Sequence, residues 1–337
     1  MRQILALTQG DPAGIGPEIA LKAWASREAA GLAPFVLIGD PDFMAERAAR
    51  LGLAVPVAAA APEEAAAAFS RALPVWPLGE RVRAEPGRPD PATAPATLAS
   101  IEAAVRLVRE GRAAALVTNP IAKHVLYAAG FRHPGHTEYL AALAAGPDGV
   151  APRPVMLLWS ELLAVVPVTI HVPLRQVLEL LTEDLVVETA RIVDRDLRAR
   201  FGLARPRLVL AGLNPHAGEE GGIGHEDRDV LAPAVARLRA EGIEIRGPLP
   251  ADTLFHARAR AGYDVALAPT HDQALIPIKT LAFDEGVNVT LGLPFLRTSP
   301  DHGTAFDIAA RGIAEPASLI AALRLAGRLA AAGRPAA

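Results

Sequence analysis

Short apolar runs alternate with longer amphipathic stretches along almost the whole chain, and this alternation restricts the possible folds most strongly. Runs of roughly four to eight apolar residues between turn residues predict strands, and apolar residues at every third or fourth position predict helices. Strands that alternate with helices favour an α/β fold with a largely parallel sheet. We expect strands at Ile4–Thr8, Phe35–Gly39, Ala113–Thr118, Val155–Trp159, Ala164–Ile170, Arg207–Leu213, Asp264–Ala268 and Val287–Leu291. We expect helices at Glu18–Ala30, Thr97–Glu110, Thr137–Ala145, Glu183–Arg200, Glu226–Glu241 and Pro316–Ala332.

The composition excludes several classes of protein. The 337 residues are 51% hydrophobic and 21% charged, which is the balance of a packed globular chain. A formal net charge of −3 argues against nucleic-acid binding and gives no reason to expect a membrane partner. The chain has no cysteine, so disulfides, thiolate metal sites and a cysteine nucleophile are excluded. The apolar runs are too short for a signal peptide or a membrane span, so we expect the cytoplasm.

Two stretches predict connections and not functional elements. Ala54–Ala68 is rich in alanine but is broken by Pro56 and Pro62, so we expect a surface connection with a small helix. Arg81–Pro95 contains several prolines and is the most linker-like stretch of the chain.

Three histidines follow three predicted strands at equivalent places. His171 ends the strand that starts at Ala164, His216 lies just past the strand Arg207–Leu213, and His271 follows the strand that ends at Ala268. Because the carboxyl ends of parallel strands meet at one edge of a sheet, we expect the three imidazoles to lie close together. Three imidazoles and one open position form a catalytic site for zinc or a similar divalent metal. A single histidine of this kind is more often a hydrogen-bonded loop residue, so the repetition carries the prediction.

A glycine-rich loop, Gly10–Glu18, follows the first predicted strand. Such a loop lets backbone N–H groups approach an anion. Its spacing is not that of the dinucleotide-binding fingerprint, and Glu18 is expected to repel a phosphate. A purely structural turn is therefore an equally good interpretation.

Two further groups are candidates for binding an anion. Thr137 follows His136 and could cap the next predicted helix, which is also the simpler explanation of both residues. Lys279, Asn288 and Arg297 each lie in or beside a predicted strand or helix end, and together they could clamp a phosphate or a carboxylate. Only three of the 34 basic residues are lysines, and Lys279 is one of them. Taken singly, each of these residues is typical of a surface.

With these residues the sequence resembles the 4-hydroxythreonine-4-phosphate dehydrogenase family of vitamin B6 biosynthesis over nearly the whole chain. The resemblance implies a metal-dependent and NAD(P)-dependent oxidation of 4-phosphooxy-L-threonine, with decarboxylation to 3-amino-2-oxopropyl phosphate. It also implies a homodimer with a shared active site. The densest matches lie in Gly10–Glu18, Thr118–Lys123, Gly135–Glu138, Gly212–Glu219, Gly247–Leu254, His271–Pro277 and Gly286–Ala305.

The resemblance also implies roles for individual residues. One divalent metal (zinc, magnesium or cobalt) is expected on His171, His216 and His271. Asp252 and Lys279 are the expected catalytic residues. The substrate is expected to contact His136, Thr137, Lys279, Asn288 and Arg297.

A more distant resemblance concerns the cofactor. Gly10–Glu18 and His302–Pro316 are similar to the opening loop and the adenosine-binding loop of isopropylmalate and isocitrate dehydrogenases. This implies two α/β/α lobes with a cleft and no Rossmann fingerprint, and NAD(P) contacts at His302, Gly303 and Asp307. Because the loop at His302 must return to the opening loop, we expect one lobe of residues 1–130 with 305–337, and a second lobe of residues 131–304.

Other functions remain open at this point. Departures from the family pattern at Gln9–Asp11, Pro269–Thr270 and Ala274 are compatible with a paralogous dehydrogenase of a four-carbon phosphorylated hydroxy acid, such as threonate or erythronate phosphate. A redox-free metal-dependent lyase or hydrolase would keep the histidines but would have no use for the loop at His302. An isopropylmalate-type enzyme would hold Mg²⁺ with aspartates, which the three histidines argue against.

Overall fold

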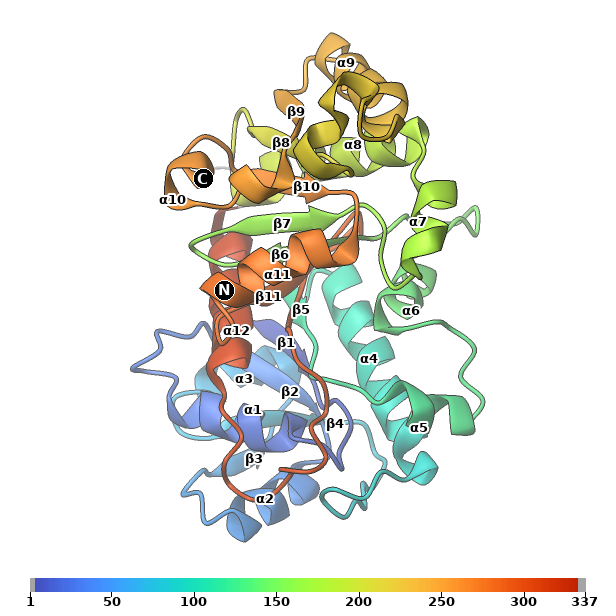
Figure 1. Ribbon diagram of the computed structural model, residues 1–337. Helices are drawn as coiled ribbons and strands as arrows, with labels where there is room; N and C mark the ends of the chain where they lie inside the picture. Colours follow the sequence, from blue (N-terminus) through green and yellow to red (C-terminus); the bar gives the residue numbers. More distant parts are fainter. Residues whose placement is uncertain (1–3, 333–337) are drawn as a thin grey trace. The chain divides into compact units, whose positions relative to one another are not determined.

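The structure is a computed structural model that describes residues 4–332 (Figure 1). The chain divides into two compact units. Of the described residues, the first unit contains 4–154 and 293–332, and the second contains Val155–Gly292. The division therefore falls after 154 and 292, whereas we expected it after 130 and 304, because helix α6 (His136–Leu143) and strand β12 (Arg297–Pro300) both pack in the first unit. Residues 1–3 and 333–337 of the expected first lobe lie outside the described residues.

The first unit contains parallel strands in the order β3-β4-β2-β1-β5-β12. Because β1, β5 and β12 are neighbours and run in the same direction, the loops after them meet at one edge of the sheet. The strands are β1 (Leu5–Thr8), β2 (Phe35–Gly39), β3 (Val57–Ala59), β4 (Leu73–Pro77), β5 (Ala115–Val117) and β12 (Arg297–Pro300).

Helices cover this sheet on both faces. An apolar cluster that includes Ile38, Ile101 and Leu140 buries α3, α4 and α6 against one face. Helix α12 packs on β5 and β12 and against α1 on the other face. The helices of this unit are α1 (Gly16–Ala25), α2 (Pro41–Arg50), α3 (Pro62–Ala68), η1 (Pro91–Thr93), α4 (Ala94–Arg109), α5 (Lys123–Ala128), α6 (His136–Leu143) and α12 (Ala317–Ala332).

The second unit contains strands in the order β11-β6-β7-β10-β8-β9. Strand β6 is antiparallel to both of its neighbours, whereas β7, β10, β8 and β9 are parallel to one another. The four parallel strands therefore end at the same edge. The strands are β6 (Val155–Trp159), β7 (Ala164–Pro167), β8 (Leu208–Ala211), β9 (Ile245–Leu249), β10 (Val265–Ala268) and β11 (Val287–Leu291).

Helix α11 covers one face of this sheet through Ala274 and Ile278, which are buried against side chains of β7, β8 and β10. Helix α8 packs on β6, β11 and α9. The helices and turns of this unit are α7 (Leu174–Leu180), α8 (Glu183–Phe201), η2 (Pro215–Gly221), η3 (Asp227–Leu231), α9 (Ala232–Ala240), η4 (Ala251–Thr253), α10 (Ala257–Arg260) and α11 (His271–Leu281).

The α/β fold and all of the predicted strands are confirmed, but some elements were missed. Ala54–Ala68 contains the expected small helix and also the edge strand β3, which is too short to show an alternating pattern. Helix α11 starts at His271, where we expected only a loop. Among residues 4–332, none of the helices combines the length and the apolar character that a membrane crossing requires.

Candidate active site

Three predicted metal ligands follow adjacent parallel strands of the second unit. His171 comes after β7, His271 after β10 and His216 after β8, and these strands lie in the order β7-β10-β8 (Figure 1). The hydroxyl of Thr169 donates a 2.6 Å hydrogen bond to the carbonyl of Pro269, which joins the ends of β7 and β10. The expected common edge is therefore present.

His171 and His271 lie side by side, with ring centroids 5.5 Å apart and ring planes at 47°. Thr270 and Gln273 cap the helix that starts at His271, through a reciprocal pair of hydrogen bonds. The Nδ1 atom of His271 is 2.8 Å from Oδ1 of Asp272. When Nδ1–H donates to this carboxylate, Nε2 carries the lone pair, which is the arrangement typical of a metal-binding histidine.

His216 lies in an unusual turn, because residues 216–220 all have φ between 42° and 78°. Residues other than glycine rarely adopt this left-handed region, so the surroundings must hold it. The buried carboxylate of Asp227 fixes the backbone just before this turn. It accepts N–H groups from Leu213 at 2.8 Å and from Asn214 at 3.0 Å, and the Asn214 side-chain amide at 2.9 Å. Asp227 was not among the predicted site residues. The sequence offers one signal for it, an acidic residue at the start of a predicted helix, just after a strand-end loop.

The donor chemistry of this edge fits a divalent metal, since imidazole nitrogen is a common zinc ligand. Two of the predicted ligands are adjacent. Within residues 4–332 of the single chain, no group of three or more histidine, aspartate or glutamate side chains is placed to hold one ion. The three-histidine site therefore stays a prediction.

The other predicted residues of the second unit lie at different distances from the histidine edge. The register places Asn288 level with Val165, at the start of β7 and away from His171. Asp252 is exposed in η4, which follows β9 and packs on η2, the turn that carries His216. Lys279 lies in the last turn of α11, with its ammonium nitrogen 5.2 Å from the ring centre of Phe283. About 12 Å of helical rise separates Lys279 from the start of α11, so it would contact a different part of a ligand from the imidazole groups. Asn288 lies in β11.

The first unit contains a buried cation at the end of its sheet. Arg297 in β12 is 4% exposed, and its Nε and Nη2 atoms donate to the hydroxyl of Thr118 at 3.1 and 2.7 Å. Burial lowers the pKa of Arg297 to about 10, so the guanidinium stays charged at neutral pH. Thr118 directly follows β5 and was not among the predicted site residues.

His136 is the second member of this group. It starts α6, and its Nε2 atom is buried with no hydrogen-bond partner among the described residues. Burial, and then the positive charge of Arg297, hold the pKa of His136 well below its usual value of 6.5. A neutral imidazole with an open nitrogen, close to a buried cation, can bind an anion such as a phosphate group. Thr137 is the next residue and is half-buried.

The opening glycine-rich loop contacts the segment after β12. The N–H of Ile15 donates to the carbonyl of Thr304 at 2.9 Å. A Cβ atom at Gly14 would lie 2.9 Å from the same oxygen, so this close approach requires glycine.

The role of Glu18 differs from our expectation. Its side chain is fully buried, accepts the N–H of Ala314 at 2.9 Å and pairs with Lys22 at 2.9 Å. Glu18 therefore anchors the segment after β12 and does not repel a ligand in the loop.

The predicted cofactor residues lie in this same segment. The Nε2 atom of His302 is buried without a hydrogen-bond partner among residues 4–332, while its Nδ1 atom is 3.0 Å from the carbonyl of Gly303. Gly303 and Asp307 are exposed. An open imidazole nitrogen and an exposed carboxylate can bind the hydroxyl groups of a ribose, so these residues fit the adenosine end of a dinucleotide. Their role stays a prediction.

The fold and these groups define an α/β protein of the kind in which strand-end loops carry an active site. The family model described as "Pyridoxal phosphate biosynthetic protein PdxA" matches residues 31–326, and the chain belongs to this family. The expected family resemblance is thereby confirmed.

Named relatives agree with this assignment. The chain is 73% identical over 328 residues to a 4-hydroxythreonine-4-phosphate dehydrogenase of Methylorubrum populi, covering 97% of this chain and 94% of that protein. It is also similar to a crystal structure of a 4-hydroxythreonine-4-phosphate dehydrogenase from Klebsiella pneumoniae, with 38% identity, a TM-score of 0.83 and coverage of 97% and 99%. A terephthalate 1,2-cis-dihydrodiol dehydrogenase from Burkholderia xenovorans is 31% identical, with a TM-score of 0.64 and coverage of 96% and 97%.

Proposed function

We propose that this protein oxidises 4-phosphooxy-L-threonine with NAD(P) and releases CO₂ to form 3-amino-2-oxopropyl phosphate, a step of vitamin B6 biosynthesis. The proposal rests on family membership over most of the chain, and on relatives that are named for this dehydrogenase activity. In the reaction the substrate hydroxyl loses a proton and its carbon loses a hydride. The product is a ketone β to the carboxylate, and CO₂ then leaves.

The cofactors supply the part of this chemistry that side chains cannot. A bound divalent ion lowers the pKa of the hydroxyl and polarises the new carbonyl, and a bound nicotinamide accepts the hydride. His171, His216 and His271 are the residues that would hold the ion. His302, Gly303 and Asp307 would hold the dinucleotide.

The remaining residues bind and orient the substrate. Arg297 stays charged and His136 stays neutral at neutral pH, so the pair offers one cation and one uncharged imidazole to the phosphate. Thr137, Lys279 and Asn288 complete the proposed contacts. Fixing the substrate at several points lowers the barrier, because the reacting groups lose less freedom in the transition state.

The proton of the substrate hydroxyl needs an acceptor. Asp252 and Lys279 are our two candidates. Asp252 is exposed in the turn that packs beside the turn of His216. Lys279 lies in the last turn of α11.

We also propose that two copies of the chain form the active enzyme in the cytoplasm. Five large apolar side chains among the described residues of the second unit are more than half exposed in the single chain: Leu162 (53%), Leu174 (70%), Leu178 (57%), Ile276 (64%) and Phe283 (71%). Exposed apolar residues of this size are common where a partner binds. They support a homodimer, which the family resemblance also implies.

Mixing two inactive variants tests the shared site. A His136→Ala chain and a His216→Ala chain are each expected to be inactive. Mixed dimers should regain activity if the two residues of one site come from different subunits. Absence of recovery in verified mixed dimers would contradict sharing between these two positions.

The activity itself is tested by reduced-nicotinamide absorbance with purified protein, a divalent metal and 4-phosphooxy-L-threonine. Threonate and erythronate phosphates serve as competitor substrates. A clear preference for either would reassign the protein to the paralogous function. Turnover of substrate without any dinucleotide would indicate a lyase or a hydrolase.

A further inference from the structure

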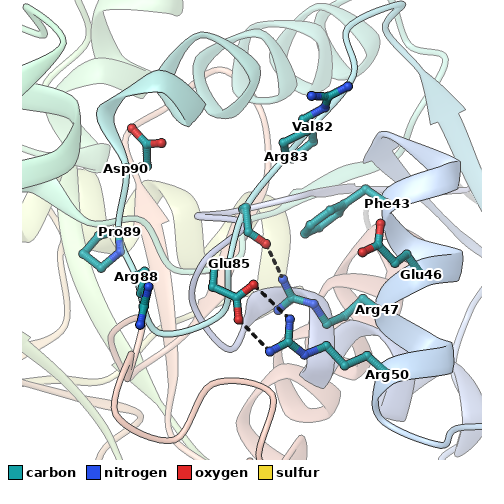
Figure 2. A pocket seen from close by; sticks show the side chains of 11 residues that line it. Phe43, Glu46, Arg47, Arg50, Val82, Arg83, Glu85, Arg88, Pro89 and Asp90 are labelled. Carbon is teal, nitrogen blue, oxygen red and sulfur yellow. Dashed lines mark hydrogen bonds and ion pairs between the residues drawn. The ribbon is translucent and has the colours of Figure 1, made fainter.

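A pocket of about 680 Å³ lies in the first unit, lined by residues of α2 and of the segment 82–90 (Figure 2). Pockets of this size commonly hold small molecules. None of the residues that we assigned above to substrate, metal or cofactor lines it. Its most distinctive feature is a set of guanidinium groups, from Arg47, Arg50, Arg83 and Arg88.

Arg47 is the innermost of these groups, and only 3% of it is exposed. Its Nη2 atom donates to the carbonyls of Pro12 at 3.1 Å and Ala84 at 3.4 Å. Its Nη1 atom is buried and has no hydrogen-bond partner among the described residues. Burial, and then the charge of Arg50, lower the pKa of Arg47 to about 10, so it stays charged at neutral pH. The negative charges of Glu85, Glu18 and Glu46 act on Arg47 and partly offset this effect on its pKa. None of them accepts a hydrogen bond from the buried Nη1 atom, and a buried N–H group without an acceptor is unfavourable.

Three acidic side chains also line the pocket, those of Glu46, Glu85 and Asp90, and Glu85 is already paired. The carboxylate of Glu85 receives two hydrogen bonds from Arg50, at 2.6 and 3.1 Å. Figure 2 shows this carboxylate facing the ends of the Arg47 and Arg50 side chains. The guanidinium groups of Arg83 and Arg88 are exposed and form no hydrogen bond or ion pair with other described residues.

We propose that this pocket binds a phosphate group, either as free phosphate or as the phosphate end of a small metabolite. Arg47, Arg83 and Arg88 are the donors, and Glu85 is an internal anion that holds Arg50 until the ligand replaces it. Phosphate fits better than a single carboxylate, because it offers more acceptor oxygens and more charge to several planar guanidinium groups. The site does not depend on the proposed reaction.

Replacing Glu85 tests the proposal, because the direction of the change in binding affinity depends on the role of this carboxylate. Removing a carboxylate that competes with the ligand should tighten binding, whereas removing one that is only structural should not. The probes are inorganic phosphate and ribose 5-phosphate. Their binding is measured by titration calorimetry at low ionic strength. The parent is the full chain with His136→Ala, which suppresses binding at the proposed substrate residues.

In this parent, Glu85→Gln should tighten phosphate binding by at least about threefold, because Arg50 becomes available for a charge-assisted bond. The double change Arg83→Gln with Arg88→Gln should weaken binding by at least about tenfold, because two charge-assisted donors are lost. Arg81→Gln is the matched control, since Arg81 pairs with Asp42 at 3.3 Å and does not line the pocket. The phosphate affinity of the Arg81→Gln chain should stay within about twofold of the parent's, because an exposed ion pair contributes little to stability.

Tighter binding of ribose 5-phosphate than of phosphate would identify a metabolite, and equal affinities would identify free phosphate. The proposal is overturned if the parent and the Glu85→Gln chain both fail to bind either probe. It is also overturned if the double variant binds as the parent does. Thermal unfolding of each variant verifies that the chain is folded. We expect the double variant to fold, because Arg83 and Arg88 are exposed.

Discussion

The two groups of candidate residues differ in how firmly the chain holds them. In the first unit, Arg297 and Thr118 are buried and joined by two hydrogen bonds, and the adjoining His136 has a buried nitrogen. In the second unit, His171 and His216 are exposed, and their backbones have φ values of 44° and 52°. The first group is part of the packed interior, whereas the second lies on turns at the surface.

Because of this difference, substitutions in the two groups should affect the stability and the activity of the protein differently. A buried charge contributes to the folded state only while its partners remain, so changes in the first group should affect both folding and substrate binding. Exposed imidazoles contribute little to folding, so changes in the second group should affect activity alone.

We expect His171→Ala to lower turnover by at least about a thousandfold, because loss of the metal removes several kcal/mol of transition-state stabilisation. The midpoint of thermal unfolding of the metal-free protein should not change. Steady-state kinetics, metal analysis and a melting curve are the measurements. His225→Ala, at another exposed histidine of the second unit, is the control and should retain activity. A fall in the metal-free melting midpoint would show that this group is structural.

Arg297→Lys should lower kcat/KM by about 100-fold, or about 2.7 kcal/mol, because lysine lacks the planar fork that binds phosphate. It should also lower the free energy of unfolding, since the two hydrogen bonds to Thr118 are lost. Urea unfolding and kinetics are measured on the same sample. Thr118→Ser keeps the accepting oxygen and should behave nearly as the wild type. Wild-type stability of Arg297→Lys would contradict the contrast between the units.

Asp227→Asn tests whether a carboxylate positions His216. The change removes charge from the group that accepts three N–H bonds, so metal affinity should fall about 10- to 100-fold, as for other partners of metal ligands. The metal dissociation constant is the readout, because a purely structural role would change stability and leave that constant alone. Asp229→Asn, at an exposed neighbour paired with Arg228, is the control and should have little effect.

Lys279→Arg should lower turnover by about tenfold, which corresponds to roughly 1.4 kcal/mol. Lysine is a compact charge with an adjustable pKa, whereas arginine is a planar group that is always charged. Lys279→Ala should in addition raise KM for the phosphorylated substrate but not for the dinucleotide. Wild-type turnover and KM in Lys279→Arg would exclude a special role for this residue.

The smallest effect concerns pH. The pKa of His136 is lowered in the folded chain, so the unfolded chain binds an extra proton below about pH 6.5. This contribution to stability is complete above that pH and is lost as the pH falls toward the folded-state pKa, by at most about 1.4 kcal/mol per pH unit. Urea unfolding between pH 5 and pH 8 should show a shallower slope in His136→Gln. Identical slopes would mean that the imidazole is accessible to protons in the folded state.

Much of the architecture follows from local patterns. The apolar runs predict the strands because strand residues that are buried on both faces are apolar without interruption. The strands β3, β4, β9 and β12 and the helix α11 are among the elements that were not predicted. Strand β3 has only three residues, and Pro277 interrupts the helical pattern of α11. The sequence did not predict the boundary between the units either. The boundary depends on the pairing of β12 with β5, and these two strands are far apart in the chain.

The sequence by itself determined the α/β class, the family and the recurrence of histidines at strand ends. These follow from periodicity and from the order of residues along the chain. Only the tertiary structure decided that Thr118 holds Arg297, that Asp227 fixes the backbone before the turn of His216, and that Glu18 is buried and accepts the N–H of Ala314. These contacts join residues far apart in the chain or oppose local backbone preference. Their energies come from burial and geometry, which no local pattern contains.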